Sequence, residues 1–190
     1  MENEDKKIVE MILAGDTSLF EDIIKKYEKS VVGFIYKMVF DYEDALELAQ
    51  ETFMKVFSSL KMYDPSYKFS TWLFTIARNK AIDFLRGGKY KNSYDDRLKI
   101  KSNGQNMPFS TNLKSPEDNF FVRDNYEKLL LIIEELPVEY REVITLRYMN
   151  NLSYGEIAKI TNLPLGTVKN RLFRAKILIR ENFERKFGKI

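Results

Sequence analysis

Hydrophobic residues recur every three to four positions along most of the chain, and the strict alternation typical of strands is missing. This pattern predicts an all-α fold. Helices are expected over residues 5–14, 17–39, 42–59, 70–86, 117–135, 138–149, 153–161 and 164–186. Three of the predicted helices begin with a capping residue three positions before an acidic residue: Asp41 with Asp44, Ser115 with Asp118, and Ser153 with Glu156. Two have a proline in the first turn, Pro116 and Pro164.

The helical period is lost between Gly87 and Lys114, where Gly, Asn, Ser, Lys and Asp dominate. A stretch of this length without structure of its own is unusual inside one compact domain and typical of a linker. We therefore expect two small helical domains, over residues 1–86 and 116–190, joined by a flexible linker over residues 87–115.

The composition excludes several kinds of chemistry. The chain has no cysteine and no histidine, which removes thiolate nucleophiles, Ser-His pairs and the usual zinc ligands. We expect no metal site, no cofactor and no small-molecule substrate. The acidic N-terminus lacks the apolar core of a signal peptide, and no apolar run is long enough to span a membrane. These features predict a cytoplasmic protein.

The net charge of +3 conceals an uneven distribution along the chain. Residues 1–60 and 116–158 carry an excess of Asp and Glu, whereas residues 61–115 and 159–190 each carry an excess of seven positive charges. Two separated basic segments favour a polyanionic partner such as a nucleic acid, although chance segregation of solvated charges gives the same pattern.

Residues 153–180 have the pattern of a helix-turn-helix. On a helical wheel of residues 164–180, Val168, Leu172, Ala175 and Ile179 form one apolar stripe. The opposite face is basic and carries one aromatic residue, as expected of a helix that lies in a major groove. A terminal amphipathic helix with a solvated face is the alternative. The candidate DNA-binding residues are Thr167, Lys169, Asn170, Arg171, Phe173, Arg174 and Lys176.

A second candidate nucleic-acid surface surrounds Trp72 in FSTWLFTIARNKAIDFLR. Exposed aromatic rings stack on unpaired bases, amides read base edges and lysines follow the phosphates. The alternative is that Trp72 packs against a neighbouring helix, as large aromatic side chains usually do. The candidate residues for an unpaired strand are Tyr67, Lys68, Phe69, Trp72, Asn79 and Lys80, with Tyr63 in the same loop.

The helix over residues 42–59 is expected to bury Ala45, Leu46, Ala49, Phe53, Val56 and Phe57. Its other face is acidic and carries an exposed methionine, which favours protein docking over DNA binding. A merely solvated face and a set of magnesium ligands are the alternatives. The candidate docking residues are Asp44, Glu47, Gln50, Glu51, Met54 and Lys55.

Three of these segments, in this order, resemble the extracytoplasmic-function (ECF) sigma factors of bacterial RNA polymerase. DALELAQETFMKVF resembles the core-binding helix, FSTWLFTIARNKAIDFLR the segment that melts and reads the minus-ten element, and LPVEYREVITLRYMNNLSYGEIAKITNLPLGTVKNRLFRAK the domain that reads the minus-thirty-five element. Family members usually carry Gly where Asn162 stands and often Ser where Asn170 stands. The first difference is compatible with a left-handed turn, and the second affects the preferred promoter.

The resemblance implies a promoter-specificity subunit that catalyses no covalent chemistry. The acidic helix face would bind the clamp helices in the largest subunit of core RNA polymerase. The surface around Asn79 would hold single-stranded promoter DNA, and the recognition helix would bind the duplex. The resemblance also implies an anti-sigma factor, often membrane-bound in this family.

Two rival functions are compatible with parts of the sequence. One is a dimeric helix-turn-helix regulator, which requires a palindromic site and does not explain the surface around Trp72. The other is a metal-dependent nucleic-acid enzyme that uses Glu47 and Glu51, which the lack of histidine and of a convergent acidic site disfavours.

Overall fold

The computed structural model describes residues 2–87 and 116–188, with side chains described for residues 4–87 and 125–188. All regular structure in these ranges is helical. The predicted linker and the capping signal at Ser115 lie outside the described residues, apart from Gly87. The elements are α1 (Glu2–Leu13), η1 (Thr17–Leu19), α2 (Phe20–Val39), α3 (Tyr42–Ser58), η2 (Leu60–Met62), α4 (Phe69–Arg86), α6 (Pro116–Glu135), α7 (Val138–Ile144), η3 (Thr145–Met149), α8 (Tyr154–Thr161) and α9 (Leu165–Phe187).

These bounds agree with the predicted helices to within a few residues, and two differences are informative. The predicted helix 17–39 begins with the short 3-10 helix η1 before α2 starts. The predicted helix 138–149 is α-helical only to Ile144 and continues as the π-helical turn η3. A π-helical turn is invisible to a pattern search based on a period of 3.6 residues.

Local capping explains where two of the central helices begin. The Asp41 carboxylate accepts a hydrogen bond of 3.0 Å from the Asp44 backbone N–H at the start of α3. At the start of α8, the Ser153 hydroxyl accepts from the Glu156 N–H at 3.3 Å, and the Glu156 carboxylate accepts from the Ser153 N–H at 2.7 Å. This is a complete capping box, as the sequence predicts.

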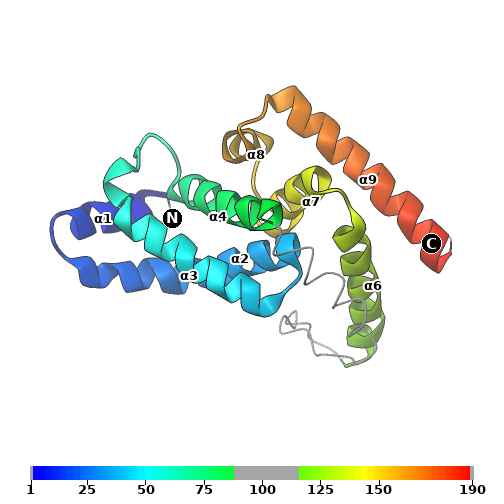
Figure 1. Cartoon of the computed structure of the whole chain (residues 1–190). Helices are drawn as coiled ribbons and strands as arrows, with labels where there is room; N and C mark the ends of the chain where they lie inside the picture. Colours follow the sequence, from blue (N-terminus) through cyan, green and yellow to red (C-terminus); the bar gives the residue numbers. More distant parts are fainter. Residues whose placement is uncertain (1, 88–115, 189–190) are drawn as a thin grey trace.

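The N-terminal half packs α2, α3 and α4 against one another, with α1 across one end (Figure 1). A buried carboxylate fixes α1 to α2. Asp5 accepts a hydrogen bond from the Tyr27 hydroxyl at 2.6 Å and another from the Lys26 ammonium. Because Asp5 is 5% exposed, its charge is stabilised mainly by these two donors.

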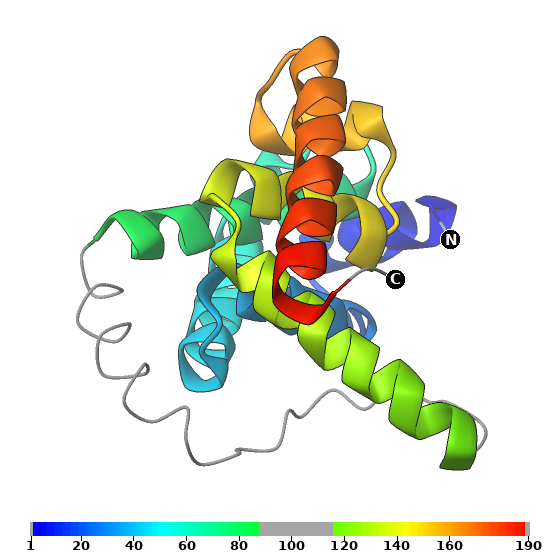
Figure 2. The same cartoon turned by 90° about the vertical axis from the view of Figure 1, so that its right-hand side faces the viewer.

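The C-terminal half packs α7 and α8 on one side of α9, with the C-terminal end of α6 against the far part of α9 (Figure 2). The predicted apolar stripe of α9 is confirmed: Val168, Leu172 and Ala175 are buried and Ile179 packs against the same core. Lys186 of α9 donates a hydrogen bond to Glu135 at the end of α6.

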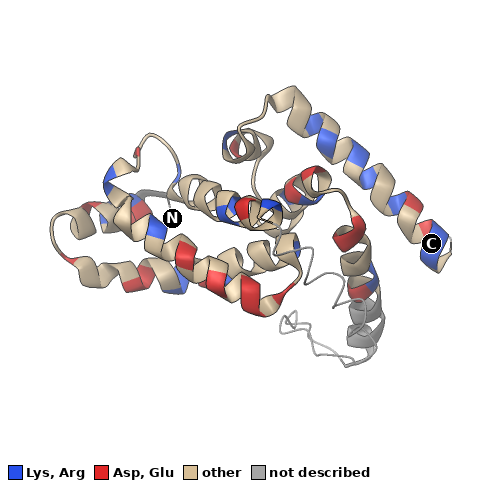
Figure 3. Ribbon diagram, in the orientation of Figure 1, with Lys and Arg blue, Asp and Glu red and all other residues tan. Residues whose placement is uncertain are grey.

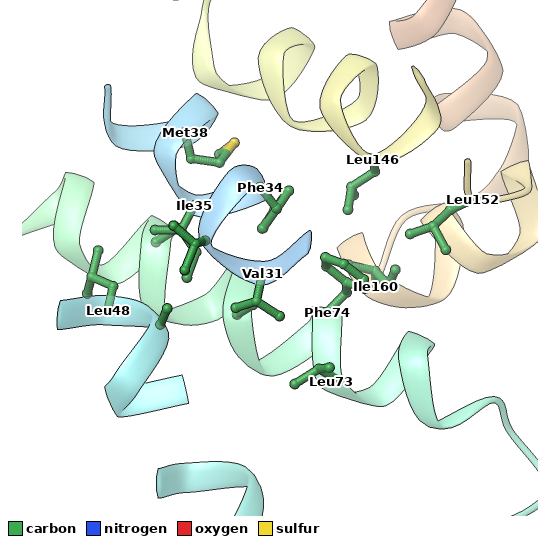
Figure 4. Packing of buried hydrophobic residues seen from close by; sticks show 14 of the residues in the cluster. Val31, Phe34, Ile35, Met38, Leu48, Leu73, Phe74, Leu146, Leu152 and Ile160 are labelled. Atoms are coloured by element: carbon green, nitrogen blue, oxygen red, sulfur yellow. The ribbon is translucent and has the colours of Figure 1, made fainter. Parts of the chain in front are cut away.

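The two halves share one hydrophobic core. Buried residues of α2 and α4 belong to the same cluster as residues of α7, η3 and α8, among them Phe34, Phe74, Leu146 and Ile160 (Figure 4). The packing pairs α4 with α8 and α2 with α6, α7 and η3. The apolar residues of the two predicted domains therefore bury one another as well as themselves.

A buried arginine joins the halves at the end of α2. The Arg141 guanidinium donates to the carbonyl oxygens of Met38 at 2.6 Å, Glu134 at 2.8 Å and Leu136 at 3.1 Å. It also lies 5.3 Å from the ring centroid of Phe40, which ends α2 in the left-handed conformation. One side chain thus satisfies carbonyl groups at the C-terminal ends of both α2 and α6.

The predicted buried face of α3 needs two corrections. Phe57 is 44% exposed and Leu46 is only half-buried, whereas Leu48 and Thr52 are buried. Phe57 lies in the last turn of α3, where its ring contacts Phe20 at 4.9 Å between centroids and is otherwise open to solvent on one side. A helical wheel gives only the angle of each residue around the helix axis. It therefore does not show where the neighbouring helix ends.

Candidate nucleic-acid interface

The predicted recognition helix is α9, and one face of its first turns is open to solvent. Asn162 ends α8 with a φ of 54°, the left-handed turn expected at this position, and Pro164 precedes the first turn of α9. Asn favours this conformation among residues with a side chain. The turn orients α9 so that its buried stripe faces α7 and α8 while the opposite face stays open.

The predicted DNA-contacting residues lie on this open face. Phe173 is 65% exposed, so its ring is accessible to a partner. The remaining exposed members of the set are Lys169, Asn170, Arg174 and Lys176, and the half-buried members are Thr167 and Arg171. Lys and Arg follow one another along this part of α9 (Figure 3).

A shallow hollow beside the N-terminal half of α9 brings in residues that the sequence did not point to. Thr167, Asn170, Arg171 and Arg174 line it together with Glu139 and Tyr140 of α7. These two residues precede α9 by more than twenty positions and belong to another helix. Only the packing of α7 on α9 places them there. Glu139 puts one negative charge at the edge of an otherwise basic hollow.

Lys176 is held at the far end of this face by an aromatic residue of η3. Its ammonium lies 5.5 Å from the ring centroid of Tyr148, which is half exposed. The hydrogen bond to the Tyr148 hydroxyl and the attraction of that group raise the pKa of Lys176. This contact favours the charged form of Lys176 and directs its ammonium toward η3.

The second predicted surface lies at the start of α4 and in the loop before it. Tyr63 donates a hydrogen bond from its hydroxyl to the Tyr67 carbonyl at 2.7 Å, and Asp64 accepts from the Ser66 N–H at 2.8 Å. That hydrogen bond lowers the pKa of Asp64. These two hydrogen bonds connect residues within the loop, and Tyr67 is 45% exposed at its tip.

The position of Phe69 corrects the sequence-based picture. Phe69 is 2% exposed, and its ring lies 5.4 to 5.8 Å from the rings of Tyr63, Trp72 and Tyr27. Its ring is not open to a base in this structure. Trp72 is half-buried on the same cluster, so part of its side chain packs on the core and part is accessible.

Asn79 and Lys80 lie further along α4. Asn79 is exposed, and its side-chain oxygen accepts a hydrogen bond of 3.3 Å from Arg78. The Lys80 ammonium donates to Glu51 of α3 at 2.6 Å. This ion pair links a residue predicted to contact the strand with one predicted to dock on a protein, because α3 and α4 are adjacent helices.

The predicted docking face of α3 is largely open. Met54 is 72% exposed, Glu47, Gln50 and Lys55 are exposed, and Asp44 and Glu51 are half-buried. Acidic residues follow this face from its first turn (Figure 3). Within the described ranges, no group of three or more acidic side chains is arranged to hold a metal ion. No helix there is long and apolar enough to cross a membrane.

An all-helical chain with a helix-turn-helix, an open basic recognition helix and a second surface of aromatic and basic residues has the features of a DNA-binding transcription protein. Comparison with known families narrows this class. Residues 23–89 match the model of Sigma-70 region 2, and residues 126–179 match that of Sigma-70, region 4. The chain belongs to the ECF RNA polymerase sigma factors and is a promoter-specific transcription initiation factor.

Named relatives agree along almost the whole chain. The chain is 34% identical to the ECF RNA polymerase sigma factor SigW of Bacillus subtilis, over 95% of this chain and 97% of that protein. It is 33% identical to the RNA polymerase sigma-H factor of Pseudomonas aeruginosa, over 92% and 91%.

Solved structures share the fold. CnrH, in complex with the cytosolic domain of CnrY, matches with a TM-score of 0.70 at 19% identity, over 96% of this chain and 98% of that chain. The sigma factor RpoE of Bartonella quintana, in complex with the anti-sigma factor NepR, matches with a TM-score of 0.64 at 20% identity, over 88% and 98%.

Proposed function

We propose that this sigma factor holds a promoter through two surfaces of different chemistry. The open face of α9 binds the minus-thirty-five duplex, with Lys169, Asn170 and Arg174 toward base edges and phosphates. The observation that carries this proposal is the exposure of Phe173 amid these residues. An aromatic ring among basic residues is suited to contact with a thymine methyl or a sugar.

The start of α4 and the loop before it hold the unpaired minus-ten strand. Tyr67 and the accessible side of Trp72 offer stacking surfaces, Asn79 offers an amide for a base edge, and Lys68 and Lys80 follow the phosphates. Phe69 packs against the ring of Trp72 and does not contact the strand. The ordered loop from Tyr63 to Tyr67 supports this assignment, because a fixed aromatic residue loses little entropy on binding.

The acidic face of α3 docks on the clamp helices of the largest polymerase subunit. Met54 provides an apolar anchor, and the charges around it provide orientation. In this proposal residues 1–86 form the unit that binds polymerase and the minus-ten strand, residues 116–190 form the unit that binds the minus-thirty-five element, and residues 87–115 connect them.

We infer that the protein performs no covalent chemistry and works in the cytoplasm, where the polymerase supplies the catalysis. An anti-sigma factor is a further expected partner. The structural neighbour RpoE of Bartonella quintana supports this expectation, because it is a sigma factor solved in complex with the anti-sigma factor NepR.

The experiment that tests the function measures the affinity of the purified protein for bacterial core RNA polymerase, followed by transcription from a genomic promoter library. We expect one-to-one binding and a distinct set of start sites. Glu47→Lys reverses a charge on the docking face and should weaken polymerase binding about tenfold, which corresponds to about 1.4 kcal/mol.

Glu10→Lys is the matched control, because Glu10 is also an exposed helical glutamate and lies on α1, outside all three proposed surfaces. Equal losses in both variants would contradict the proposed docking face. Absence of polymerase binding, combined with dimeric binding of the chain alone to palindromic duplex DNA, would contradict the two-surface proposal in favour of a stand-alone regulator.

A further inference from the structure

Helix α1 packs against the segment that the proposed function assigns to the minus-ten strand. It contacts both η2 and α4, which lie on either side of the loop from Tyr63 to Tyr67 (Figure 1). None of the residues assigned above to promoter DNA or to polymerase belongs to α1. This helix is therefore close to the strand-binding loop without being part of the proposed contact surface.

Asp5 connects α1 to an aromatic cluster that extends to that surface. The Tyr27 hydroxyl donates to Asp5 at 2.6 Å, and the Tyr27 ring lies 5.8 Å from the Phe69 ring between centroids. The Phe69 ring lies at the same centroid distance, 5.8 Å, from the ring of Trp72. Three successive contacts thus join a buried carboxylate to a ring on which a base is proposed to stack.

Tyr63 provides a second route from Asp5 to the loop. The Tyr63 ring lies 5.4 Å from that of Phe69 and 5.5 Å from that of Trp72. Its hydroxyl donates to the Tyr67 carbonyl at 2.7 Å. Burial, followed by the negative charge of Asp5, raises the pKa of Tyr63. The Asp5 charge thus acts on Tyr63, and the hydroxyl keeps the proton that it donates within the loop.

The hydrogen bonds of Asp5 add direction to a contact that apolar packing already makes. Val9 and Ile12 of α1 are buried in the core and attach the helix without help from Asp5. Apolar burial is non-directional, whereas a hydrogen bond restricts both distance and angle. Because Asp5 accepts from Tyr27 and from Lys26, it restricts where the Tyr27 ring lies against the cluster.

From this geometry we propose that Asp5 is a positioning residue for the minus-ten strand: through Tyr27 and Phe69 it orients the ring of Trp72 for stacking on an unpaired base. This inference rests on the proposed strand capture. Asp5 is buried and makes no contact with the strand itself. A ring that is oriented before binding loses less conformational entropy when the base stacks. Loss of the connection should therefore weaken promoter opening and leave the binding of duplex and polymerase unchanged.

The test uses holoenzyme reconstituted from core RNA polymerase and the full-length chain, on a promoter found in the transcription library. Three quantities are measured for each variant: the affinity for core polymerase, the affinity for promoter duplex at a temperature too low for melting, and the extent of opening at the minus-ten element. Permanganate reactivity of unpaired thymines reports the opening. A merely structural role lowers all three through the amount of folded protein, whereas a positioning role lowers only the third.

Two variants interrupt the connection by different means. Tyr27→Phe keeps the ring and removes its bond to Asp5, and Asp5→Asn removes the charge at nearly constant size. We expect each to lower the equilibrium constant for opening about three- to tenfold. The double variant should lose less than the product of the two, because both changes act on the same bond. The matched controls are Tyr42→Phe and Glu10→Gln, at exposed positions, and they should equal wild type.

A reference variant separates this proposal from the strand capture on which it depends. Tyr67→Ala with Asn79→Ala removes two exposed groups assigned to the strand. If the reference variant lowers opening while Tyr27→Phe and Asp5→Asn match their controls, the positioning role is overturned and strand capture stands. Equal losses in all three quantities for Tyr27→Phe and Asp5→Asn would also overturn it. Unchanged opening in the reference variant and in both of these variants would contradict strand capture itself.

Discussion

Single residues at helix ends determine where several helices of this molecule begin and end, and these residues are the features that the sequence predicts best. Asp41, Ser153 and Asn162 each satisfy or turn the backbone at one point where a helix begins or ends. Their effect depends on neighbours within a few positions, so it can be predicted from the local sequence. Asp5 and Arg141 act over long sequence separations, and no local pattern predicts their partners.

The capping box at α8 leads to the first prediction. Ser153→Ala removes the acceptor for the Glu156 N–H and should lower the free energy of unfolding by about 0.5–2 kcal/mol. Urea denaturation followed by circular dichroism measures the change. Ser58→Ala, an exposed serine in the last turn of α3, is the control and should change stability by less than about 0.5 kcal/mol.

The Tyr27 hydroxyl leads to a prediction about alkaline pH. Burial, followed by the hydrogen bond to Asp5, raises the pKa of Tyr27 far above its ordinary value of 10.0. Below pH 10 both the folded and unfolded chains keep the proton, so this group's contribution to stability is fully present. Above pH 10 only the unfolded chain ionises, and stability falls by up to about 1.36 kcal/mol per pH unit.

Tyr27→Phe isolates this contribution. At pH 7 the variant should be about 1–3 kcal/mol less stable, because Asp5 loses a donor. The difference from wild type should shrink as the pH rises from 10 to 11, as measured by urea denaturation at each pH. Tyr42→Phe, at an exposed tyrosine, serves as the comparison. A difference that stays constant across this range would show that Tyr27 ionises equally in both states.

At the scale of helices, periodicity predicted bounds and buried faces with few errors, because a period of 3.6 residues depends on one element at a time. The errors fall where two elements meet. Phe69 was expected at a binding surface but is enclosed by Tyr27, which comes from α2. Phe57 was expected in the core but lies in the last turn of α3. Glu139 and Tyr140 reach the recognition helix only through packing.

The recognition helix leads to a prediction at this scale. Arg174→Ala should weaken binding to promoter duplex by about 1–3 kcal/mol if the guanidinium contacts a base edge in two places. If it contacts a phosphate, the slope of log affinity against log salt should instead become shallower by about one, with sequence preference kept. Lys169→Ala should follow the same rule. Fluorescence anisotropy over a series of salt concentrations separates the two cases.

Arg185→Ala is the matched control on the same helix. Arg185 lies in the last turn of α9, where it donates to Asn182 at 2.9 Å, well away from the hollow lined by Arg174. It should leave both affinity and salt slope unchanged. If Arg174→Ala and the control behave alike, the DNA-binding face of α9 has been assigned wrongly.

At the scale of the whole molecule, the sequence predicted two units and could not predict that they dock. Each half offers an apolar face to the other, but a hydrophobic pattern does not say which face meets which. The contact between the halves includes Arg78 and Glu142, which form an ion pair at 2.5 Å although 64 positions separate them. Glu142 is almost fully buried, so its charge depends on this partner.

A double-mutant cycle measures this dependence. Glu142→Gln and Arg78→Gln should each destabilise the chain, by up to about 3 kcal/mol for the variant that leaves a buried charge unpaired. The double variant should lose less than the sum of the two. The exposed pair of Glu21 and Lys25 on α2 is the control cycle, with an expected coupling of about 0.3–0.5 kcal/mol. Equal couplings in the two cycles would contradict a structural role for the inner pair.

The position of Trp72 has a practical consequence, because it is the chain's single tryptophan. Its ring lies 5.5 Å from that of Tyr63 and 5.8 Å from that of Phe69, at the start of the helix that α8 covers. The tryptophan emission of the unlabelled protein therefore comes from one known place. A shift of its wavelength, or quenching by a stacked base, would give a dye-free optical signal for events at that junction.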